Sequence, residues 1–473
     1  MVDLTFEEII KVTGGKLLQG NIHYLPSGFS IDTRTLEPGE VFVALKGERT
    51  DGHNYLGEAF QRGASGALVS YPPAGEKIPE GFVLIQVNNP LKALQDTAAY
   101  YRRKLPVRII GVTGSSGKTT TKDLIAGVLQ KRFYTLKTQG NLNNELGFPL
   151  MLLKLTPEHQ VAVLEMGMSA LEEIRFLARL SNPEVGVITN IGEAHYEILG
   201  SREAIAQAKG ELLQELGPKG TAILNGDDSR QQMLAEQFPG KVIYYGLKNG
   251  SQVKGFDLKP VQGEGDWGTV FTVFIEGRRE ELFIPLPGEH NVYNALAAVA
   301  CGLYMGLSPE EIRQGLGECC LSVMRMDIQE APWGITIIND AYNANFSSTM
   351  ASMKTLPQVG QGRRCIAVLG DMLELGDIQE ECHREVGREA ARLGLHCLLG
   401  MGPLMALAVE AAQEKGLKEA RYFTEHASLC WELLEILRPG DYVLVKGSRG
   451  MKMEKIVEYL KNISKESRNS HED

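Results

Sequence analysis

The segment 110–120, with the sequence IGVTGSSGKTT, constrains the fold of this chain more than any other stretch. A mostly apolar run over 107–112 precedes a turn rich in glycine and serine, and apolar residues at helical spacing follow it. This order predicts a strand, a phosphate-binding loop and a helix whose N-terminus faces an anion. The sequence therefore predicts a nucleoside triphosphate site formed by Thr113, Gly114, Ser115, Ser116, Gly117, Lys118, Thr119 and Thr120.

The loop departs from the strict Walker pattern at one position. That pattern has a glycine six residues before the lysine, where this chain has Val112; the glycine stands at Gly111 instead. In such a loop the lysine, here Lys118, reaches the terminal phosphates, and a threonine hydroxyl ligates Mg²⁺. The loop is thus a variant that keeps the residues needed for phosphate binding.

Composition narrows the class of protein. The 473 residues correspond to about three domains, and 43% hydrophobic and 23% charged residues are typical of globular proteins. A net charge of −10 argues against a nucleic-acid partner. The acidic start does not resemble a signal peptide, and the longest apolar stretch, 295–307, is too short to span a bilayer. Seven scattered cysteines indicate reduced thiols, so we expect a cytoplasmic protein without membrane insertion.

The pattern of apolar runs predicts three α/β domains. Residues 1–98 contain short strands, predicted at 41–45, 66–69 and 82–85. Longer apolar runs separated by helices then indicate two sheets that are mostly parallel and covered on both faces. These runs lie at 107–112, 161–164, 185–188 and 221–224 in residues 99–316, and at 335–338, 365–369, 396–399 and 442–445 in residues 317–473. Residues 251–285 are predicted to extend the central sheet with antiparallel strands, and the polar tail after Ser464 is expected to be frayed.

Polar residues that follow the apolar runs are candidates for chemistry, because ligands gather at the carboxyl ends of parallel strands. Glu165 and His195 fall on the same predicted edge as the phosphate loop. A carboxylate beside a nucleotide is a suitable Mg²⁺ ligand, and an imidazole is a softer one. The alternatives are a carboxylate that caps a neighbouring helix and a solvated loop histidine.

Lys209 lies within the apolar face of a helix predicted to begin after Ser201 and to end near Leu216. Burying a free ammonium is unfavourable. The side chain therefore either extends out to solvent, or it is paired or modified. A lysine with a lowered pKa can react with CO₂ to form a carbamate, which reverses its charge and provides two oxygen ligands.

Three further places have two explanations each. Asn291 and Asn294 share one helical face and suit recognition of a base edge, or Asn291 caps the helix. Asp340 follows a strand and suits a ribose or a metal-bound water, and similar polar loops follow 369 and 445; either the three form a second ligand-binding face or each is an ordinary loop. Arg325 either crosses a cleft between domains or is an ordinary surface arginine.

Several motifs together resemble those of the Mur ligases and the related folylpolyglutamate synthases. The motif TGxxGKTT at 113–120 is similar to the phosphate loop of that family, and the run GNLNNELGFPL at 140–150 resembles its substrate loop. The segments 30–34 and 51–53 resemble a UDP-sugar domain, and 339–345 resembles the signature of the third domain. The resemblance extends over nearly the whole chain and implies an N-terminal UDP-substrate domain, a central P-loop ATPase-like domain and a C-terminal Rossmann-like domain.

The resemblance implies an ATP-dependent ligase of cytoplasmic peptidoglycan precursor synthesis. ATP would phosphorylate the free carboxylate of UDP-N-acetylmuramoyl-tripeptide, and the amine of D-alanyl-D-alanine would attack the acyl phosphate. A tetrahedral intermediate would then collapse to the amide and phosphate. Another Mur-type amino-acid ligase or a folylpolyglutamate synthase is the alternative enzyme, and a nucleotide-sensing module without catalysis is the alternative outside that class. A monomer suits three domains that close on one another.

The resemblance also implies roles for individual residues. Thr119 and Glu165 would bind one Mg²⁺, while His195 and a carbamylated Lys209 would help to bind a second. The catalytic residues would be Lys118, Lys209, His195 and Arg325, with Arg325 at the γ-phosphate. Asn291 and Asn294 would face adenine and Asp340 the ribose. The remaining substrate-binding residues would be Asp32, Thr33, Arg34, Asp51, Gly52, His53, Asn141, Asn143, Asn144, Asn343, Asn345, Lys446, Ser448 and Arg449. Phe346 is a departure, because the family usually has proline there.

Overall fold

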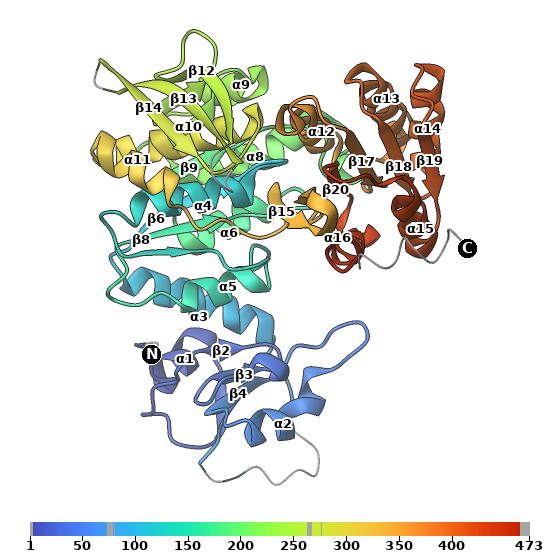
Figure 1. Cartoon of the computed structure of the whole chain (residues 1–473). Coiled ribbons are helices and arrows are strands. Elements are labelled where there is room, and N and C mark those ends of the chain that lie inside the picture. Colours follow the sequence, from blue (N-terminus) through green and yellow to red (C-terminus); the bar gives the residue numbers. More distant parts are fainter. Residues whose placement is uncertain (1–2, 73–78, 80, 263–266, 276, 464–473) are drawn as a thin grey trace.

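A computed structural model describes residues 3–72, 79, 81–262, 267–275 and 277–463 of the chain. Within them, three sheets follow one another along the sequence. The first lies at the bottom of Figure 1, and the second and third lie side by side above it. This arrangement confirms the predicted three-part α/β architecture.

The first sheet has the strand order β1-β5-β4-β3-β2, in which only β1 is antiparallel to its neighbour. On one face of this sheet, Phe42, Leu56 and Leu84 pack together in a core that is separate from the other cores of the chain. The long helix α3 connects it to the second sheet. Its elements are α1 (Phe6–Thr13), β1 (Lys16–Gln19), β2 (Phe29–Ser30), η1 (Thr33–Thr35), β3 (Val41–Val43), η2 (Gly52–Tyr55), α2 (Leu56–Gln61), β4 (Gly66–Val69), β5 (Val83–Gln86) and α3 (Pro90–Lys104).

The second sheet has nine strands in the order β14-β13-β12-β11-β10-β9-β6-β8-β7. The strands from β12 to β7 are parallel, and β13 and β14 add the predicted antiparallel extension. Its elements are β6 (Arg108–Thr113), α4 (Lys118–Leu129), β7 (Thr135–Lys137), α5 (Gly147–Leu153), β8 (Val161–Glu165), α6 (Glu173–Ser181), β9 (Val185–Ile188), α7 (Tyr196–Leu199), α8 (Arg202–Leu216), β10 (Thr221–Asn225), α9 (Ser229–Glu236), β11 (Lys241–Gly246), β12 (Val253–Gln262), β13 (Trp267–Ile275), β14 (Arg278–Ile284), α10 (Glu289–Tyr304) and α11 (Pro309–Gly317).

The third sheet has the order β15-β16-β20-β17-β18-β19, and all of its strands except β15 are parallel. Its elements are β15 (Asp327–Ala331), η3 (Pro332–Gly334), β16 (Ile335–Asp340), α12 (Phe346–Gly360), β17 (Cys365–Gly370), η4 (Gly376–Ile378), α13 (Gln379–Arg392), β18 (Cys397–Met401), α14 (Met405–Glu414), β19 (Ala420–Phe423), α15 (His426–Ile436), β20 (Tyr442–Lys446), η5 (Arg449–Met451) and α16 (Glu454–Lys461).

The continuous core places the phosphate loop. Helix α4 packs against α10, and the strand β6 that feeds the loop is buried between β8 and β9. The side chains of Ile110, Leu124 and Val299 are all buried in this core. Because both faces of the sheet are covered, the polar groups of this region meet at the carboxyl ends of the strands.

The apolar runs predicted the buried strands correctly, whereas several peripheral strands escaped prediction. The missed strands are β1, β2, β7, β11, β15 and β19, while β12 and β14 lie within the antiparallel segment predicted over 251–285, although their bounds were not predicted. Most of them are short or partly exposed, and β12 contains charged residues and Pro260. Such strands lack the continuous apolar run that marks a buried parallel strand. The sequence also predicts a turn at Glu276-Gly277 and a connection rich in proline and glycine over 72–81; of these segments, 73–78, 80 and 276 lie outside the described residues, as does the tail after 463.

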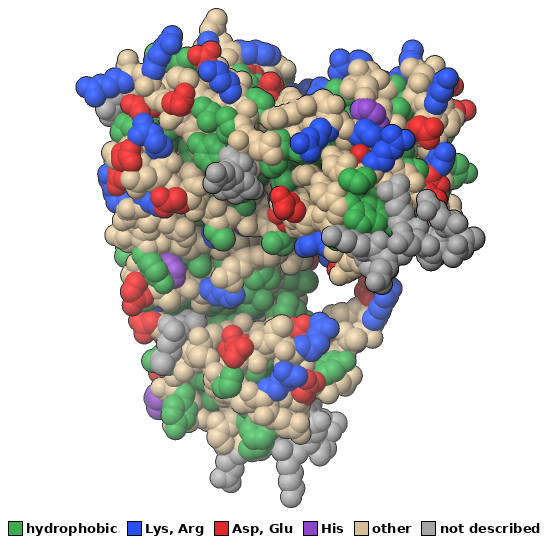
Figure 2. Space-filling model, viewed as in Figure 1, with side chains coloured by type: hydrophobic (Ala, Val, Ile, Leu, Met, Phe, Trp, Pro, Cys, Tyr) green, Lys and Arg blue, Asp and Glu red, His purple; other side chains and the backbone are tan. Residues whose placement is uncertain are grey.

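The surface in Figure 2 mixes cationic and anionic side chains without a broad field of one sign on this face. The same view shows a notch between the first sheet, at the bottom, and the third sheet, at the upper right. None of the helices in the described parts of the chain is both long and apolar enough to cross a bilayer.

Candidate active site

The turn between β6 and α4 has the geometry of a phosphate-binding loop. Gly114 has a φ of +153°, and a Cβ added there would lie 1.8 Å from Thr189 Oγ1. Gly117 has a φ of +77°, and its added Cβ would lie 2.6 Å from Asn294 Oδ1. Both positions therefore need glycine. Gly117 occupies the cap position of α4 and has no side chain, so the first N–H groups of the helix remain for an anion.

Residues that follow β9 hold this loop in place. Ser115 N donates to Asn190 O at 3.1 Å, and Ser116 N donates to Asn190 Oδ1 at 2.8 Å. Thr189 Oγ1 donates to Ser116 O. These bonds fix the loop backbone from a neighbouring strand, so its shape is preorganised for a ligand.

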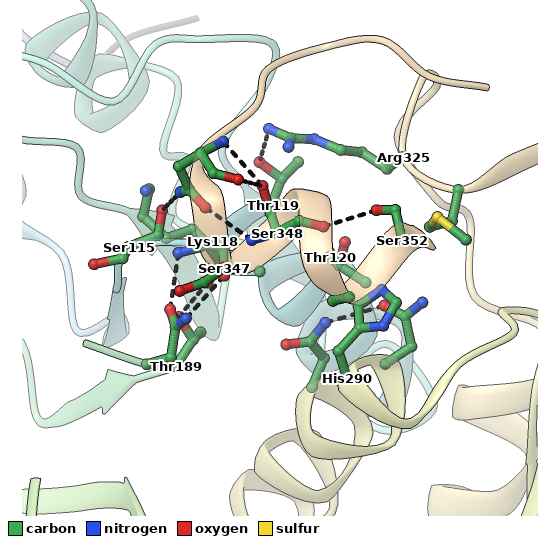
Figure 3. A pocket seen from close by; sticks show the side chains of 18 of the residues that line it. Ser115, Lys118, Thr119, Thr120, Thr189, His290, Arg325, Ser347, Ser348 and Ser352 are labelled. Carbon is green, nitrogen blue, oxygen red and sulfur yellow. Dashed lines mark hydrogen bonds between the residues drawn. The ribbon is translucent and has the colours of Figure 1, made fainter. Parts of the chain in front are cut away.

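A cavity of about 250 Å³ opens at the loop, and several segments that lie far apart in the sequence line it. Figure 3 shows the loop residues on one side, Arg325 above Thr119, and His290 on the far side. The predicted residues in its lining are Ser115, Ser116, Gly117, Lys118, Thr119, Thr120, Asn291, Asn294, Arg325, Asp340, Asn343, Asn345 and Lys446. The other predicted site residues that the structure describes lie outside this lining: Thr113, Gly114, Glu165, His195, Lys209, Asn141, Asn143, Asn144, Ser448, Arg449, Asp32, Thr33, Arg34, Asp51, Gly52 and His53.

Lys118 lies across the mouth of the loop. Its Nζ donates to Gly114 O at 2.7 Å. Burial lowers the pKa of this ammonium; Glu165 opposes that shift and Arg325 adds to it. Lys118 is therefore a poorly solvated cation beside a second cation. An incoming anion, such as a triphosphate, would stabilise it.

Glu165 provides a hard oxygen atom next to the loop. It ends β8, which pairs with β6, and its side chain is 3% exposed. Oε1 accepts a hydrogen bond from Asn143 Nδ2 at 2.8 Å, while Oε2 is buried without a hydrogen-bond partner among the described residues. An unpaired buried carboxylate oxygen fits a Mg²⁺ ligand. Thr113 is buried on the adjacent strand, where its Oγ1 donates to Met166 O at 3.0 Å.

The described residues contain no group of three or more His, Cys, Asp or Glu side chains placed to hold a metal ion. A Mg²⁺ at Glu165 would therefore need other oxygen donors. Nucleotide phosphates and water are the usual donors for Mg²⁺ bound through one or two carboxylates. The residues present fit a metal that arrives with its nucleotide.

Lys209 is buried, so the explanation that its side chain extends to solvent is wrong. It lies on α8, which begins after the cap residue Ser201 as predicted, and it is 1% exposed. Its Nζ lies 3.6 Å from Met168 Sδ. Burial, followed by the charge of Lys118, lowers the pKa of Lys209 well below its ordinary value. The lowered pKa favours the neutral form of the amine, which is nucleophilic.

His195 is engaged by a loop of the third sheet. Its Nδ1 lies 2.7 Å from Glu374 Oε2, and the imidazole lowers the pKa of that carboxyl group. Glu197 N donates to Glu374 O at 3.0 Å. The 193–197 and 373–376 loops are therefore docked on each other, and this joins the second sheet to the third.

Asn291 and Asn294 form a hydrogen-bonded pair on α10. Asn294 Nδ2 donates to Asn291 Oδ1 at 3.1 Å, and Asn291 Nδ2 donates to Pro287 O at 2.8 Å. Thr121 Oγ1 donates to Asn294 Oδ1 at 3.1 Å, which ties the pair to α4. The helix cap is Gly288, so the alternative that Asn291 caps this helix is wrong. Both amides lie in the cavity wall in a fixed orientation.

Arg325 crosses from the connection between the second and third sheets to the phosphate loop. Its Nη2 donates to Thr119 Oγ1 at 3.3 Å, and its guanidinium lies 4.1 Å from the centre of the Tyr342 ring. Met324 and Met326 on either side have positive φ angles of +60° and +51°. The backbone thus turns sharply around Arg325. Because its guanidinium is bonded to Thr119 of the phosphate loop, the explanation that it is an ordinary surface arginine is wrong.

Asp340 and Lys446 form a buried ion pair in the wall of the cavity. Lys446 Nζ donates to Asp340 Oδ2 at 2.6 Å, and Ser352 Oγ donates to the same oxygen at 2.7 Å. Asp340 Oδ1 accepts only a longer bond, of 3.3 Å, from Met326 N. Oδ1 is therefore the atom with capacity for a ribose hydroxyl.

The other predicted residues of the third sheet are bonded to one another or to the loop. Asn345 caps α12, and its Nδ2 donates to Ser115 O at 3.1 Å, so it joins the third sheet to the phosphate loop. Ser448 Oγ donates to the Ala344 carbonyl at 3.2 Å. Arg449 N donates to Asn343 Oδ1 at 3.2 Å. Hydrogen bonds within the chain therefore fix the conformations of these loops.

The predicted residues of the first sheet shape two short turns. Asp32 caps η1 and forms an ion pair with Arg34, and the Thr33 side chain is buried. Asp51 caps η2, and hydrogen bonds from Tyr71 and His53 lower its pKa to about 2. Gly52 begins η2, where an added Cβ would lie 2.7 Å from backbone atoms of the preceding strand end. His53 Nε2 accepts from Ser70 N at 2.9 Å, so Nδ1 donates to Asp51.

The predicted substrate loop reaches the metal-site carboxylate through a single residue. Asn143 contacts Glu165, as described above. Asn144 Oδ1 accepts from Gly147 N at 2.9 Å and so supports the start of α5. Asn141 is exposed, and its carbonyl accepts from Asn143 N at 2.8 Å.

The residues of the cavity wall that escaped prediction include His290 and three serines of α12. His290 directly precedes Asn291, and Ser347, Ser348 and Ser352 lie on the first turns of α12. The position of His290 beside the asparagine pair was a usable signal. The three serines had no signal in the sequence, because only the docking of α12 against the phosphate loop brings them to the cavity.

We expect stability to depend on pH through His290. Burial lowers its pKa from 6.5 to about 4, so the unfolded chain binds more protons than the folded one between these values. The contribution of His290 to the free energy of unfolding is therefore fully present above pH 6.5. It falls by at most about 1.4 kcal/mol per pH unit as the pH drops toward 4. Urea unfolding of His290→Asn and the unsubstituted chain between pH 7 and 4 tests this. Equal pH slopes for both proteins would contradict it.

Comparison with known proteins places the chain in a family. The Mur ligase middle domain matches residues 112–302, the Mur ligase glutamate ligase domain matches 324–449, and the Mur ligase family catalytic domain matches 27–102. A UDP-N-acetylmuramoyl-tripeptide–D-alanyl-D-alanine ligase of Bacillus subtilis is 40% identical, over 97% of this chain and 99% of its own length.

Two solved structures share the fold over almost the whole chain. MurF from Acinetobacter baumannii matches with a TM-score of 0.86 and 32% identity, over 97% of this chain and 99% of that one. MurF from Thermotoga maritima in complex with ADP matches with a TM-score of 0.79 and 25% identity, over 92% and 97%. The chain belongs to the Mur ligase family.

Proposed function

We propose that this protein joins D-alanyl-D-alanine to UDP-N-acetylmuramoyl-tripeptide with consumption of ATP, a step of peptidoglycan precursor synthesis. Similarity over the full chain to ligases named for this reaction supports the choice of substrates. The observation that carries the proposal is the cavity at the phosphate loop, where Lys118, Arg325 and the start of α4 converge. An ADP complex of a structural relative supports the use of ATP.

The reaction begins with transfer of the γ-phosphoryl group to the tripeptide carboxylate. Phosphoryl transfer depends mainly on positioning and charge neutralisation. The N–H groups at the start of α4 bind phosphate oxygens, and Lys118 and Arg325 neutralise the transferring group. Asn291 and Asn294 hold the adenine, and Asp340 Oδ1 holds the ribose. The amine of the dipeptide then attacks the acyl phosphate and phosphate leaves.

Mg²⁺ neutralises phosphate charge and orients the triphosphate when it is bound. Glu165 and Thr119 would hold one ion, and His195 and a carbamylated Lys209 would contribute to a second. The unpaired Oε2 of Glu165 and the lowered pKa of Lys209 support these assignments.

The three parts of the chain divide the substrates among them. We propose that residues 1–98 bind the UDP-sugar, 99–316 bind ATP and 317–473 close over the site. The predicted residues of the first sheet and of the 140–150 loop would contact the UDP substrate. Asn343, Asn345, Lys446, Ser448 and Arg449 would form the side that receives the dipeptide. We further propose a monomer that works in the cytoplasm.

Closure on ATP is expected because ligands of one site come from two sheets. Asn345 bonds Ser115, and Arg325 bonds Thr119, so the third sheet contributes directly to the phosphate loop. Small-angle X-ray scattering should show a smaller radius of gyration for the protein with a nonhydrolysable ATP analogue and Mg²⁺ than for the protein without them. Identical scattering curves with and without nucleotide would contradict closure.

The assay that tests the function measures phosphate release from ATP in the presence of paired substrates. We expect release only when UDP-N-acetylmuramoyl-tripeptide and D-alanyl-D-alanine are both present. Single amino acids as the amine test the other Mur-type ligases, and a folate with glutamate tests the folylpolyglutamate synthase alternative. Lysine and diaminopimelate forms of the tripeptide, assayed side by side, identify the third residue. No release with any pair would favour a nucleotide-sensing module.

A further inference from the structure

The segment 318–326, called the strap below, connects α11 to β15 and carries Arg325 to the phosphate loop. It joins the second sheet to the third. Since Arg325 lies near the end of the strap, the position of its guanidinium depends on where the strap is attached.

One carboxylate on α4 attaches the strap. Asp123 Oδ2 accepts hydrogen bonds from Ser322 N at 2.9 Å and from Ser322 Oγ at 2.7 Å. Asp123 is 1% exposed. Hydrogen bonds to a charged acceptor are stronger than those between neutral groups, and burial strengthens them further.

Two lysines neutralise this carboxylate, and one of them makes a second bond to the strap. Lys137 Nζ donates to Asp123 Oδ1 at 2.7 Å and to Cys320 O at 2.8 Å. Lys122 Nζ lies 3.2 Å from Asp123 Oδ1 and donates to Thr138 O at 2.9 Å. Their charges lower the pKa of Asp123 despite its burial, so it stays ionised. Asp123 and Lys137 together thus bond the strap at Cys320 and at Ser322.

The attachment point and the target of Arg325 lie on the same face of α4. Thr119, which accepts the bond from Arg325, is four residues before Asp123. Residues four apart on a helix are neighbours on one face. Helix α4 therefore holds the strap at Asp123 and receives its arginine one turn nearer to the phosphates.

We infer that Asp123 is a positioning residue that sets the place of Arg325 relative to the bound triphosphate. This inference rests on the proposed function, in which Arg325 neutralises the transferring phosphoryl group. Asp123 is not among the residues that line the cavity; it acts through the strap. A guanidinium displaced by about 1 Å is expected to lower turnover by about 10- to 100-fold.

A double-mutant cycle tests the inference. Asp123→Asn, Arg325→Ala and the double variant are compared by turnover and by the affinity for Mg-ATP from calorimetry, with the melting temperature as the measure of stability. We expect Asp123→Asn to lower turnover by at least tenfold in the unsubstituted background. In the Arg325→Ala background the same change should lower turnover less than twofold, because the group that it positions is gone.

The outcomes separate the inference from the function on which it rests. Equal losses from Asp123→Asn in both backgrounds would overturn the positioning role and leave the proposed function intact. Unchanged turnover and ATP affinity in Arg325→Ala would instead overturn the proposed role of the arginine, and the inference with it.

A second pair of variants separates positioning from folding. Ser322→Ala removes one hydrogen bond of the strap and leaves the buried charges paired, so the protein should fold even if Asp123→Asn does not. We expect a smaller loss of turnover in the same direction, again absent from the Arg325→Ala background; an unchanged turnover would count against the inference. Asp441→Asn is the matched control, since Asp441 is a buried carboxylate bonded to Arg364 and to Arg438 N. It should lower the melting temperature while turnover stays within twofold.

Discussion

Replacing Lys118 with alanine is expected to lower turnover at least ~100-fold, the scale for loss of one preorganised electrostatic contact in an active site. The ammonium lies in the phosphate loop with its pKa lowered by burial, and within the described part of the chain it donates a hydrogen bond to the Gly114 carbonyl of the same loop. A phosphate would satisfy this charge better than a carbonyl does. Initial rates of phosphate release with saturating substrates give the measurement.

The change at Lys118 should act on chemistry more than on folding. Alanine removes a cation that has little favourable pairing in the absence of ligand, so the melting temperature without nucleotide should not fall. Lys92→Ala is the control, because Lys92 pairs only with Asp96 on an exposed helix face and should keep its turnover. Turnover of Lys118→Ala within a few fold of the unsubstituted enzyme would exclude the proposed role.

Replacing Lys209 with alanine is expected to abolish turnover and to allow partial rescue by small carboxylates such as formate or acetate. The lysine is buried, and its lowered pKa favours the neutral amine, the form that can attack CO₂. The new N–C bond gives a carbamate, and the amine proton is released to solvent. In the alanine variant the vacated space holds a free carboxylate, which replaces the two missing oxygens.

Lys122 provides the matched control for rescue. It is as buried as Lys209, but its Nζ is already bonded to Asp123 and to Thr138 O. Lys122→Ala should therefore gain nothing from added carboxylates. An electron-density map at high resolution that shows an unmodified Lys209 in crystals grown with bicarbonate would refute the carbamate.

The sequence predicted the parts of the site that lie directly after buried strands. The apolar runs that end near Thr113 and Leu164 place the phosphate loop and Glu165 at one sheet edge, because β6 and β8 are parallel neighbours. The helix that carries Lys209 was predictable from its Ser201 cap and its apolar face. In each case a local pattern determines the position.

Contacts between residues that lie far apart in the sequence were not predictable from one sequence. His195 and Glu374 are 179 positions apart in the chain, and nothing local to either residue indicates that they meet. The buried pair of Asp340 and Lys446 also depends on β16 lying next to β20. The segment 51–53 resembles a substrate-binding motif, yet in the structure its polar atoms mainly bond to one another and to Ser70 and Tyr71. Such pairings follow from strand order, which the apolar pattern does not determine.

The central claim is that the carboxylate of the peptide substrate is activated by the γ-phosphoryl group of ATP at the phosphate loop. Its most direct test uses UDP-N-acetylmuramoyl-tripeptide labelled with ¹⁸O in the terminal carboxylate, with ATP, Mg²⁺ and D-alanyl-D-alanine. The account predicts that each phosphate released carries one ¹⁸O atom from the substrate. Phosphate that carries oxygen from water alone, while the amide product forms, would contradict it.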